Sequence, residues 1–253
     1  LTLRRQERTL RSYSDTLKDM VQERSTRLES AEKELQRDYQ IQSVLNTLLS
    51  QSLSDDSLQQ HMDRALELLL SIGWFPSKDI GCIFVTDNSG NLHMLSWKNL
   101  EEATVRNCAA LKKGTCACGH CSKTKSIVVV NSDDPVHELC STDSGKHTNL
   151  CVPILRGNAV LGVINLVLKY GYVPDAKDTH FIQSVAKTLA QIILYCNALD
   201  RLRESEEHYR SMFESTGTAM GILDRNNFVT HANTRFNKLF FNGAADSLPE
   251  SIL

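Results

Sequence analysis

The chain has 253 residues, 41% of them hydrophobic and 23% charged, so it can fold as one domain of ordinary size with added helices or as two small domains. Its formal net charge of −2 gives no bulk attraction to nucleic acid, which is not an expected partner. No apolar run approaches the roughly 18 residues that span a bilayer, and the charged N-terminus is not typical of a signal peptide. Eight cysteines in a long, Lys/Glu-rich chain favour reduced thiols and a cytoplasmic location.

Residues 1–50 form a polar, helix-forming block without glycine or proline. Apolar residues recur every seven positions in two frames, which are Leu3, Leu10 and Leu17, and then Val21, Leu28 and Leu35. This repeat predicts a parallel coiled coil and therefore a homodimer, with a stutter at the four-residue step between the frames. A single solvated helix is the alternative, but a helix of this kind needs a packing partner to be stable in water.

The hydrophobic period then changes several times along the chain. Residues 55–72 predict an amphipathic helix that Asp55 or Asp56 caps and Gly73 ends. The elements expected after it are two strands around a turn over 81–97, a short helix over 100–111, a loop over 112–126, a strand over 127–130, a second loop over 131–147, two antiparallel strands over 151–155 and 159–168, and a helix from Asp175 or Asp178 to about residue 205. This order predicts an α+β fold with an antiparallel sheet between long helices.

The last part of the chain repeats the change of period. After a helical linker, MGILD and NFVTHAN predict two strands around a turn over 225–227, and TRFNKLF begins a helix. About 45 residues are too few for a domain with its own core, so we expect this part to be incomplete.

Three stretches carry a family likeness when they are taken in order. LKKGTCACGHCSKTKSIVVVN, HTNLCVPILRGNAVLGVINLVL and DAKDTHFIQSVAKTLAQIIL together resemble a GAF domain of bacterial sensor kinases and cyclic-di-GMP enzymes, over about residues 41–200. SEEHYRSMFESTGTAMGILDRNNFVTHANTRFNKLF resembles the opening of a PAS domain, and the N-terminal helix resembles the signalling helix of receptor kinases. The resulting division is a signalling helix over 1–50, a GAF domain over 51–204 and a truncated PAS domain over 205–253.

The resemblance implies a larger signalling protein, a sensor histidine kinase of a two-component system or a diguanylate cyclase. It implies an upstream membrane or sensory segment, a downstream kinase or cyclase, and a homodimer formed through the N-terminal and post-GAF helices. The chain contains no phosphoacceptor-histidine segment, ATP-binding glycine loop or GGDEF-like motif. We therefore expect this chain not to be an enzyme itself.

Five cysteines fall within 36 residues, on segments that the GAF resemblance places around a ligand pocket. The resemblance implies that Cys116, Cys118, Cys121 and Cys151 border the pocket and could bind a cofactor. The second loop adds further candidate ligands, so that the metal-binding set is Cys116, Cys118, Cys121, His137, Cys140, His147 and Cys151. The resemblance implies that the positions matching the pattern that recurs in this group of GAF domains are Cys116, Cys118, His137, His147 and Cys151, whereas Cys121 and Cys140 are additions. Thiolates and imidazoles bind zinc and iron, and cysteines hold iron–sulfur clusters.

Three interpretations of these cysteines stay open. One is a bound metal or iron–sulfur cluster of iron or zinc, and a second is a redox pair formed by Cys118 and Cys121, which have C-x-x-C spacing. The third is that they are small buried side chains lining an ordinary pocket. Outside the cluster, Cys82 and Cys196 are expected to be core residues and Cys108 a helix-packing residue.

The function predicted from these features is a cytoplasmic sensory and signal-transduction module. A metal, a cluster or a redox change would be sensed at the Cys/His-rich pocket, and the paired helices would relay the signal to an output domain outside this chain. The alternatives are a passive GAF dimerisation module and a GAF domain that binds a small organic ligand such as a cyclic nucleotide. The clustered thiols speak against a nucleotide.

Overall fold

The computed structural model describes residues 2–51, 54–135 and 145–240, and in the first range it describes side chains from residue 17 to residue 50. The chain divides into two compact units, residues 1–193 and 194–253, which meet within one long helix. Among the described residues, no helix combines the length and the apolarity needed to cross a membrane.

Helix α1 runs from Thr2 to Gln51, which confirms the predicted N-terminal helix. Its predicted heptad positions are open to solvent in the single chain: Leu28 is 70% exposed and Leu35 is 72% exposed. Near its C-terminus, Leu48 is buried. The helix therefore carries an uncovered apolar seam, and the predicted pairing with a second copy stays a prediction.

The first unit is built on a six-stranded sheet in which all paired strands are antiparallel. The strand order is β3-β2-β1-β6-β5-β4. The strands are β1 (Ser77–Thr86), β2 (Leu92–Lys98), β3 (Ala110–Leu111), β4 (Val128–Asn131), β5 (His147–Arg156) and β6 (Ala159–Lys169). The long central strands β5 and β6 are mostly buried and β1 is buried in its middle, as expected for strands covered on both faces. This sheet confirms the predicted α+β class.

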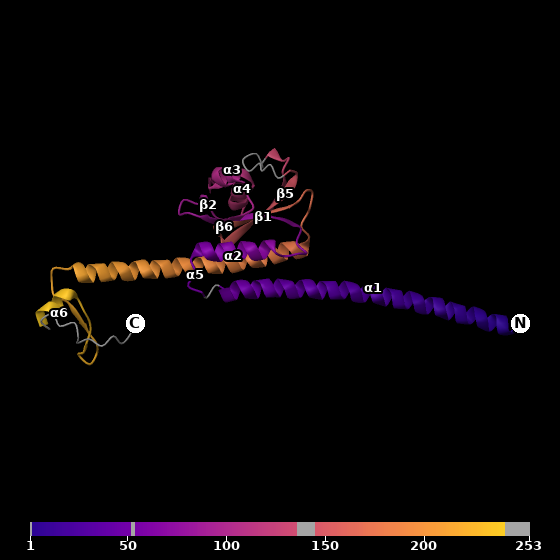
Figure 1. Cartoon of the computed structure of the whole chain (residues 1–253), viewed down its shortest axis with the longest axis horizontal. Helices are drawn as coiled ribbons and strands as arrows, with labels where there is room; N and C mark the ends of the chain where they lie inside the picture. Colours follow the sequence, from indigo (N-terminus) through magenta and orange to yellow (C-terminus); the bar gives the residue numbers. More distant parts are fainter. Residues whose placement is uncertain (1, 52–53, 136–144, 241–253) are drawn as a thin grey trace. The chain divides into compact units, whose positions relative to one another are not determined.

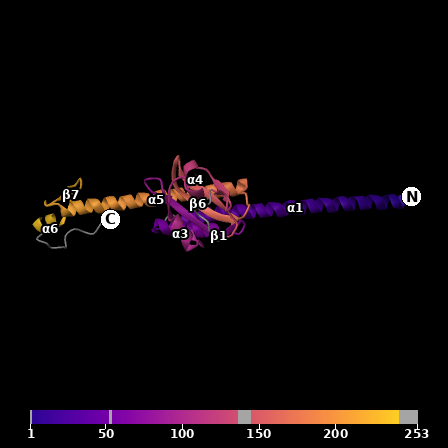
Figure 2. The same cartoon turned by 90° about the horizontal axis from the view of Figure 1, so that it is seen from above.

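Helices cover both faces of this sheet (Figure 1). Helix α2 (Leu58–Leu70) and the first half of α5 (Ala176–Ser215) lie on one face, where Leu66, Leu69 and Phe181 are buried. Helices α3 (Glu102–Cys108) and α4 (Cys116–Thr124) lie on the other face. Seen from above, these two lie over different halves of the sheet, α3 toward β2 and α4 over β4, β5 and β6 (Figure 2).

Several predicted element boundaries are wrong. Ser57, not Asp55 or Asp56, caps α2: its hydroxyl accepts from the backbone of Gln60, whose side chain reaches back to the Ser57 amide. The predicted loop over 112–126 contains α4. The spacing of large apolar residues did not reveal this helix, because its buried side is made of small residues. Helix α5 continues without a break through the predicted helical linker and ends at Ser215.

The second unit holds the end of α5 and a small hairpin. Strands β7 (Gly221–Leu223) and β8 (Val229–Ala232) pair antiparallel and α6 (Thr234–Phe240) follows, as the sequence predicts. The fully buried Asn233 ties these pieces together, because its side-chain amide donates to the carbonyls of Phe213 and Thr218 while its oxygen accepts from the amide of Met220. The resemblance of this segment to a PAS domain stays a prediction.

Candidate functional site

Helix α4 contributes three of the clustered cysteines and packs closely on the sheet. Its buried residues are Cys116, Ala117, Cys118, Gly119, Cys121 and Ser122. Gly119 sets how closely the helix approaches the preceding loop. A Cβ at this position would lie 2.7 Å from the carbonyl oxygen of Lys112 and 3.0 Å from the amide nitrogen of Gly114. The close packing of the helix against the loop therefore requires glycine at this position of the C-x-C-G motif.

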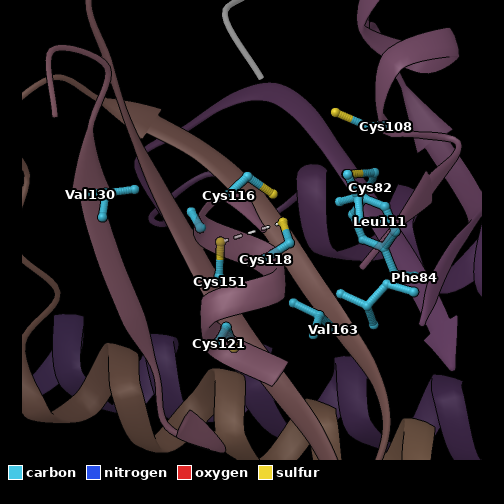
Figure 3. Packing of buried hydrophobic residues seen from close by; sticks show 12 residues of the cluster. Cys82, Phe84, Cys108, Leu111, Cys116, Cys118, Cys121, Val130, Cys151 and Val163 are labelled. Atoms are coloured by element: carbon cyan, nitrogen blue, oxygen red, sulfur yellow. Dashed lines mark hydrogen bonds between the residues drawn. The ribbon is translucent and has the colours of Figure 1, made fainter. Parts of the chain in front are cut away.

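The sulfur atoms of Cys118 on α4 and Cys151 on β5 lie 3.7 Å apart (Figure 3). Both residues are buried, with exposed fractions of 1% and 0%. Cys116 lies close enough to Cys118 to contribute to the raised pKa of its thiol. Cys116 also begins the helix with a φ of +52°, a left-handed conformation that is uncommon outside glycine. The fold thus brings thiols from the two predicted pocket segments into contact.

A chain of polar contacts continues from Cys151 across three neighbouring strands. In register, Cys151 of β5 pairs with Asn165 of β6, and Asn165 pairs with Cys82 of β1. The Cys151 thiol donates to Oδ1 of Asn165 at 3.6 Å, and Nδ2 of Asn165 donates to the sulfur of Cys82 at 3.9 Å. Sequence reasoning assigned Cys82 to the core and did not single out Asn165. An asparagine inside the apolar run AVLGVINLVL was the available signal, because a buried amide needs partners.

A small cavity lies beside these thiols, between the sheet and the helices α3 and α4. It has a volume of about 20 Å³, and its lining includes Cys82, Cys108, Cys118, His147, Asn149 and Asn165. Cys108, which the sequence suggested is a helix-packing residue, therefore borders the same space. The volume suits about one water molecule. Ligand pockets usually measure roughly 300–1,000 Å³, so in this conformation the cavity is too small for a nucleotide.

The environment of the cluster disfavours thiolates. Hydrogen bonds with Cys116 and Cys151, and then burial, raise the pKa of the Cys118 thiol well above its usual range. Burial, followed by the proximity of Cys151, raises the pKa of Cys82 and of Cys121. A nucleophilic cysteine needs a lowered pKa instead. These three thiols are therefore protonated at neutral pH, and the arrangement suits a redox pair or a metal site, in which the cation compensates the thiolate charge.

The structure places five of the seven predicted metal ligands. Cys116, Cys118, Cys121 and Cys151 lie in one buried cluster, and the buried His147 lines the cavity with its Nδ1 2.7 Å from the carbonyl oxygen of Gly145. The other two, His137 and Cys140, lie outside the described residues. Within the described ranges, no three His, Cys, Asp or Glu side chains converge closely enough to hold a metal ion. The described donors alone therefore do not complete the four-ligand set of structural zinc or of an iron–sulfur cluster.

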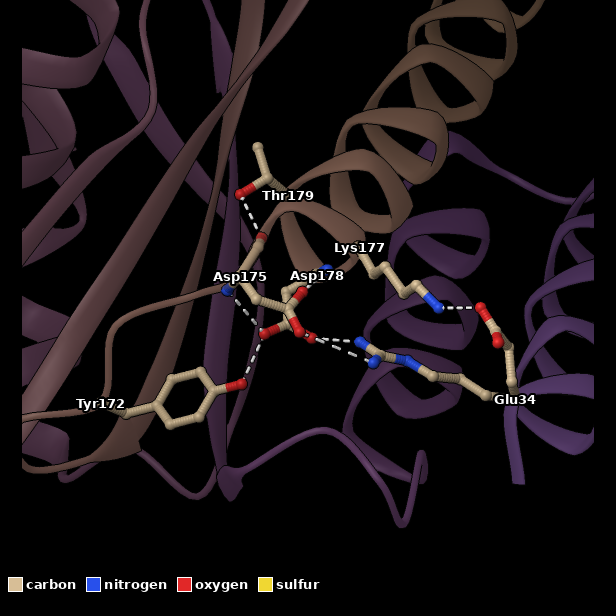
Figure 4. A network of polar contacts seen from close by, with 7 residues as sticks. Glu34, Tyr172, Asp175, Lys177, Asp178 and Thr179 are labelled. Atoms are coloured by element: carbon tan, nitrogen blue, oxygen red, sulfur yellow. Dashed lines mark hydrogen bonds and ion pairs between the residues drawn. The ribbon is translucent and has the colours of Figure 1, made fainter. Parts of the chain in front are cut away.

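A second polar network joins α1 to the start of α5 (Figure 4). The guanidinium of Arg37 donates to Oδ1 of the buried Asp178 at 2.5 Å and lies 4.1 Å from the ring centre of Trp74. The other carboxylate oxygen of Asp178 accepts from the Tyr172 hydroxyl at 2.5 Å and from the Asp175 amide at 3.1 Å. Burial and the contact with Asp178 raise the pKa of Tyr172 to about 12.

Comparisons with known proteins agree with this architecture. A family model described as GAF domain matches residues 55–194, which is more than half of the chain. A search of curated protein sequences gives no match.

Solved structures share the fold at low sequence identity. A GAF domain of a phosphoenolpyruvate-protein phosphotransferase from Coxiella burnetii is 18% identical with a TM-score of 0.53. The match covers 64% of this chain and 98% of the Coxiella domain. The corresponding domain from Acinetobacter is 15% identical with a TM-score of 0.51, covering 62% and 93%. Free methionine-R-sulfoxide reductase from Neisseria meningitidis, in complex with its substrate, is 19% identical with a TM-score of 0.52, covering 63% and 91%. At these identities the likeness concerns the fold alone.

Proposed function

Because this chain belongs to the GAF domain family, a family of sensory modules, we propose that it is the sensory part of a larger cytoplasmic signalling protein. A stimulus acts at the buried cysteine cluster, and paired helices carry the change to a kinase or cyclase that follows. The observation that carries the proposal is the contact between Cys118 and Cys151, which links α4 to the central sheet at a cavity bordered by further thiols.

The exposed apolar seams of the helices support a homodimeric relay. In α1 the predicted positions Leu28 and Leu35 lie uncovered one heptad apart. In the second half of α5, the exposed Tyr195, Leu202 and Tyr209 also recur every seven residues. Seams of this period are covered in parallel coiled coils. A second copy of the chain, with the same seams in the same order, is the natural occupant of both.

The contact of Arg37 with Asp178 gives the relay a mechanical joint. It fixes one point of α1 to the first turn of α5, and the flanking Lys177 pairs with Glu34 of α1 (Figure 4). A displacement of the sheet that moves the start of α5 therefore moves α1. Helix pairs of this type can change register or rotation between discrete packings.

The protein acts by binding and relay rather than by catalysis. The raised pKa of Cys118, Cys82 and Cys121 is the opposite of what an activated thiol nucleophile requires. The size of the cavity also favours a small stimulus, such as a metal ion or an oxidant, over a cyclic nucleotide.

Sedimentation analysis of dimer formation tests the relay. Replacing both Leu28 and Leu35 by Asn places polar groups in the seam and is expected to weaken the dimer by at least about a hundredfold in Kd. The matched control replaces Glu29 and Lys33, which lie off the seam of the same helix, by Asn. Unchanged affinity in the leucine variant, or equal weakening in both variants, contradicts a dimer paired through this seam.

Elemental analysis of protein purified without oxygen tests the stimulus. Stoichiometric iron with broad absorption near 400 nm indicates a cluster, and colourless stoichiometric zinc indicates a tetrahedral site. Either result requires ligands beyond the described residues, and His137 and Cys140 are the candidates for substitution. Protein that lacks metal and whose helix pairing does not respond to oxidation, reduction or metal addition is a passive dimerisation module.

A further inference from the structure

We propose that Cys118 and Cys151 are a redox pair that a small peroxide converts into a disulfide between α4 and β5. The proposal rests on the proposed role of the cysteine cluster as the stimulus site and names its chemistry. The sequence spacing suggested Cys118 with Cys121 as the pair. In the structure the partner of Cys118 across the packing interface is Cys151, with their sulfurs 3.7 Å apart and both side chains buried.

Geometry favours this pair over the other cysteines of the same helix. Cys116 precedes Cys118 by two residues on the same segment and is in a left-handed conformation, so a bond between these two would not link α4 to the sheet. A bond between Cys118 and Cys151 instead joins two elements that already pack on each other. Its formation shortens the sulfur–sulfur distance from 3.7 Å to about 2.05 Å.

The cavity selects the oxidant by size. Cys118 lines the space of about 20 Å³, which accepts a molecule little larger than water. Hydrogen peroxide exceeds water by one oxygen atom, whereas glutathione disulfide is a pair of tripeptides. A space of this size favours peroxide over glutathione disulfide as the oxidant.

Hydrogen peroxide oxidises the two thiols to a disulfide in two steps. The sulfur of Cys118, whose thiol is protonated, attacks one peroxide oxygen while its proton passes to the departing oxygen. The O–O bond breaks, and a sulfenic acid and one water molecule form, more slowly than from a thiolate. The sulfur of Cys151 then attacks the sulfur of that sulfenic acid, the S–O bond breaks, and a disulfide and a second water molecule form. In total two thiols are oxidised by two electrons, hydrogen peroxide is reduced to two waters, and the two thiol protons leave in the water.

Oxidation disturbs the polar chain beneath the helix. In the reduced protein, the Cys151 thiol donates to Oδ1 of Asn165, which is 8% exposed. A disulfide has no proton to donate, so this buried oxygen loses a partner. An unsatisfied buried acceptor is destabilising, which favours a rearrangement of β6 against β5 and β1. The disulfide thus changes the sheet as well as the position of α4.

Peptide mapping after peroxide treatment tests the pair in the intact protein. Cleavage by trypsin yields one peptide, 114–123, that contains Cys116, Cys118 and Cys121. Cys151 lies in peptide 147–156 and Cys140 in peptide 126–146. Metal-free protein is treated with hydrogen peroxide, remaining thiols are alkylated, and the linked peptides are identified by mass. We expect the 114–123 to 147–156 link to predominate, with at least tenfold less of it in Cys118→Ala and unchanged amounts in Cys121→Ala and Cys116→Ala.

Each other outcome overturns the pair. These are a link that persists in Cys118→Ala, a predominant link to peptide 126–146, a bond inside peptide 114–123, and no link at all. Circular dichroism and thermal unfolding of each reduced variant confirm that it is folded before its peptides are compared. Sedimentation of the same samples keeps the two proposals apart, because a dimer without the disulfide refutes the redox pair and leaves the helical relay standing.

Discussion

At the scale of single residues, the cysteine cluster depends on a glycine as much as on its sulfurs. Gly119 lets α4 lie against residues 112–114, and its carbonyl oxygen accepts the amide of Gly114 at 2.8 Å. Because Cys118 directly precedes Gly119 in the chain, the close packing of α4 against residues 112–114 also sets the position of Cys118. A side chain at Gly119 would push the helix away from the loop and alter the distance between Cys118 and Cys151.

Gly119→Ala is therefore expected to destabilise the domain by roughly 2 kcal/mol, because the added methyl group meets backbone atoms that cannot move aside easily. Gly73→Ala is the matched control, since no atom lies within 4 Å of a Cβ there, and it is expected to leave the stability within about 1 kcal/mol. Urea unfolding of both variants gives the comparison. Equal stabilities of the two variants would show that the close approach of α4 is not needed.

The residue patterns explain which parts of this fold could be predicted. The pair β5 and β6 was predictable because an apolar run around Arg156-Gly157-Asn158 specifies a hairpin. Helix α4 was not, because cysteine, alanine and glycine on its buried side leave no periodic large residues. Within the cluster, the family resemblance indicated Cys118 and Cys151. The roles of Cys82, Cys108 and Asn165 depend on strand register and helix placement, which the sequence pattern did not specify.

At the scale of elements, the described side chains of α1 that join it to the rest of the first unit include Leu48 and Arg37. Most of its described side chains are exposed, while Leu48 is buried and the side chain of Arg37 is only 22% exposed. Arg37 supplies the ion pair to Asp178, whose side chain is 2% exposed. A buried carboxylate that loses its cation is strongly destabilised, so this joint is both a stabilising contact and the place where the motion of one helix reaches the other.

Arg37→Ala is expected to lower the free energy of unfolding by roughly 3 kcal/mol, because it leaves the Asp178 carboxylate without its cation. Arg37→Lys keeps the charge but loses the planar stack on Trp74 and is expected to fall between wild type and alanine. Arg27→Ala is the control on the same helix: its pair with Glu23 is exposed and should contribute at most about 0.5 kcal/mol.

Chemical unfolding measures these stabilities, and hydrogen exchange locates the effect. We expect faster exchange in α1 around residue 37 and in the first turn of α5 for Arg37→Ala. A stability loss no larger than that of Arg27→Ala would contradict the joint.

At the scale of the whole molecule, the redox state of the cysteine pair and the pairing of the helices are expected to share one coupling free energy. If disulfide formation between Cys118 and Cys151 changes how the helices pair, then helix pairing changes the tendency of the disulfide to form by the same free energy. This reciprocity requires no knowledge of the path between the sites. It also distinguishes a sensor from a dimer that happens to contain cysteines, because in the latter the two equilibria are independent.

The midpoint potential of the thiol pair measures this linkage. The Leu28→Asn and Leu35→Asn double variant weakens the dimer without touching the cluster, and we expect it to shift the potential by at least about 30 mV, which corresponds to a tenfold change in the equilibrium constant. If oxidation tightens the dimer, losing the dimer disfavours the disulfide and raises the potential. If oxidation loosens the dimer, the potential falls. The variant with Asn at positions 29 and 33 should retain the wild-type value, and dilution of the wild type below its dimer Kd should reproduce the shift. A single potential for all three proteins at all concentrations would mean that the cluster and the helices are uncoupled.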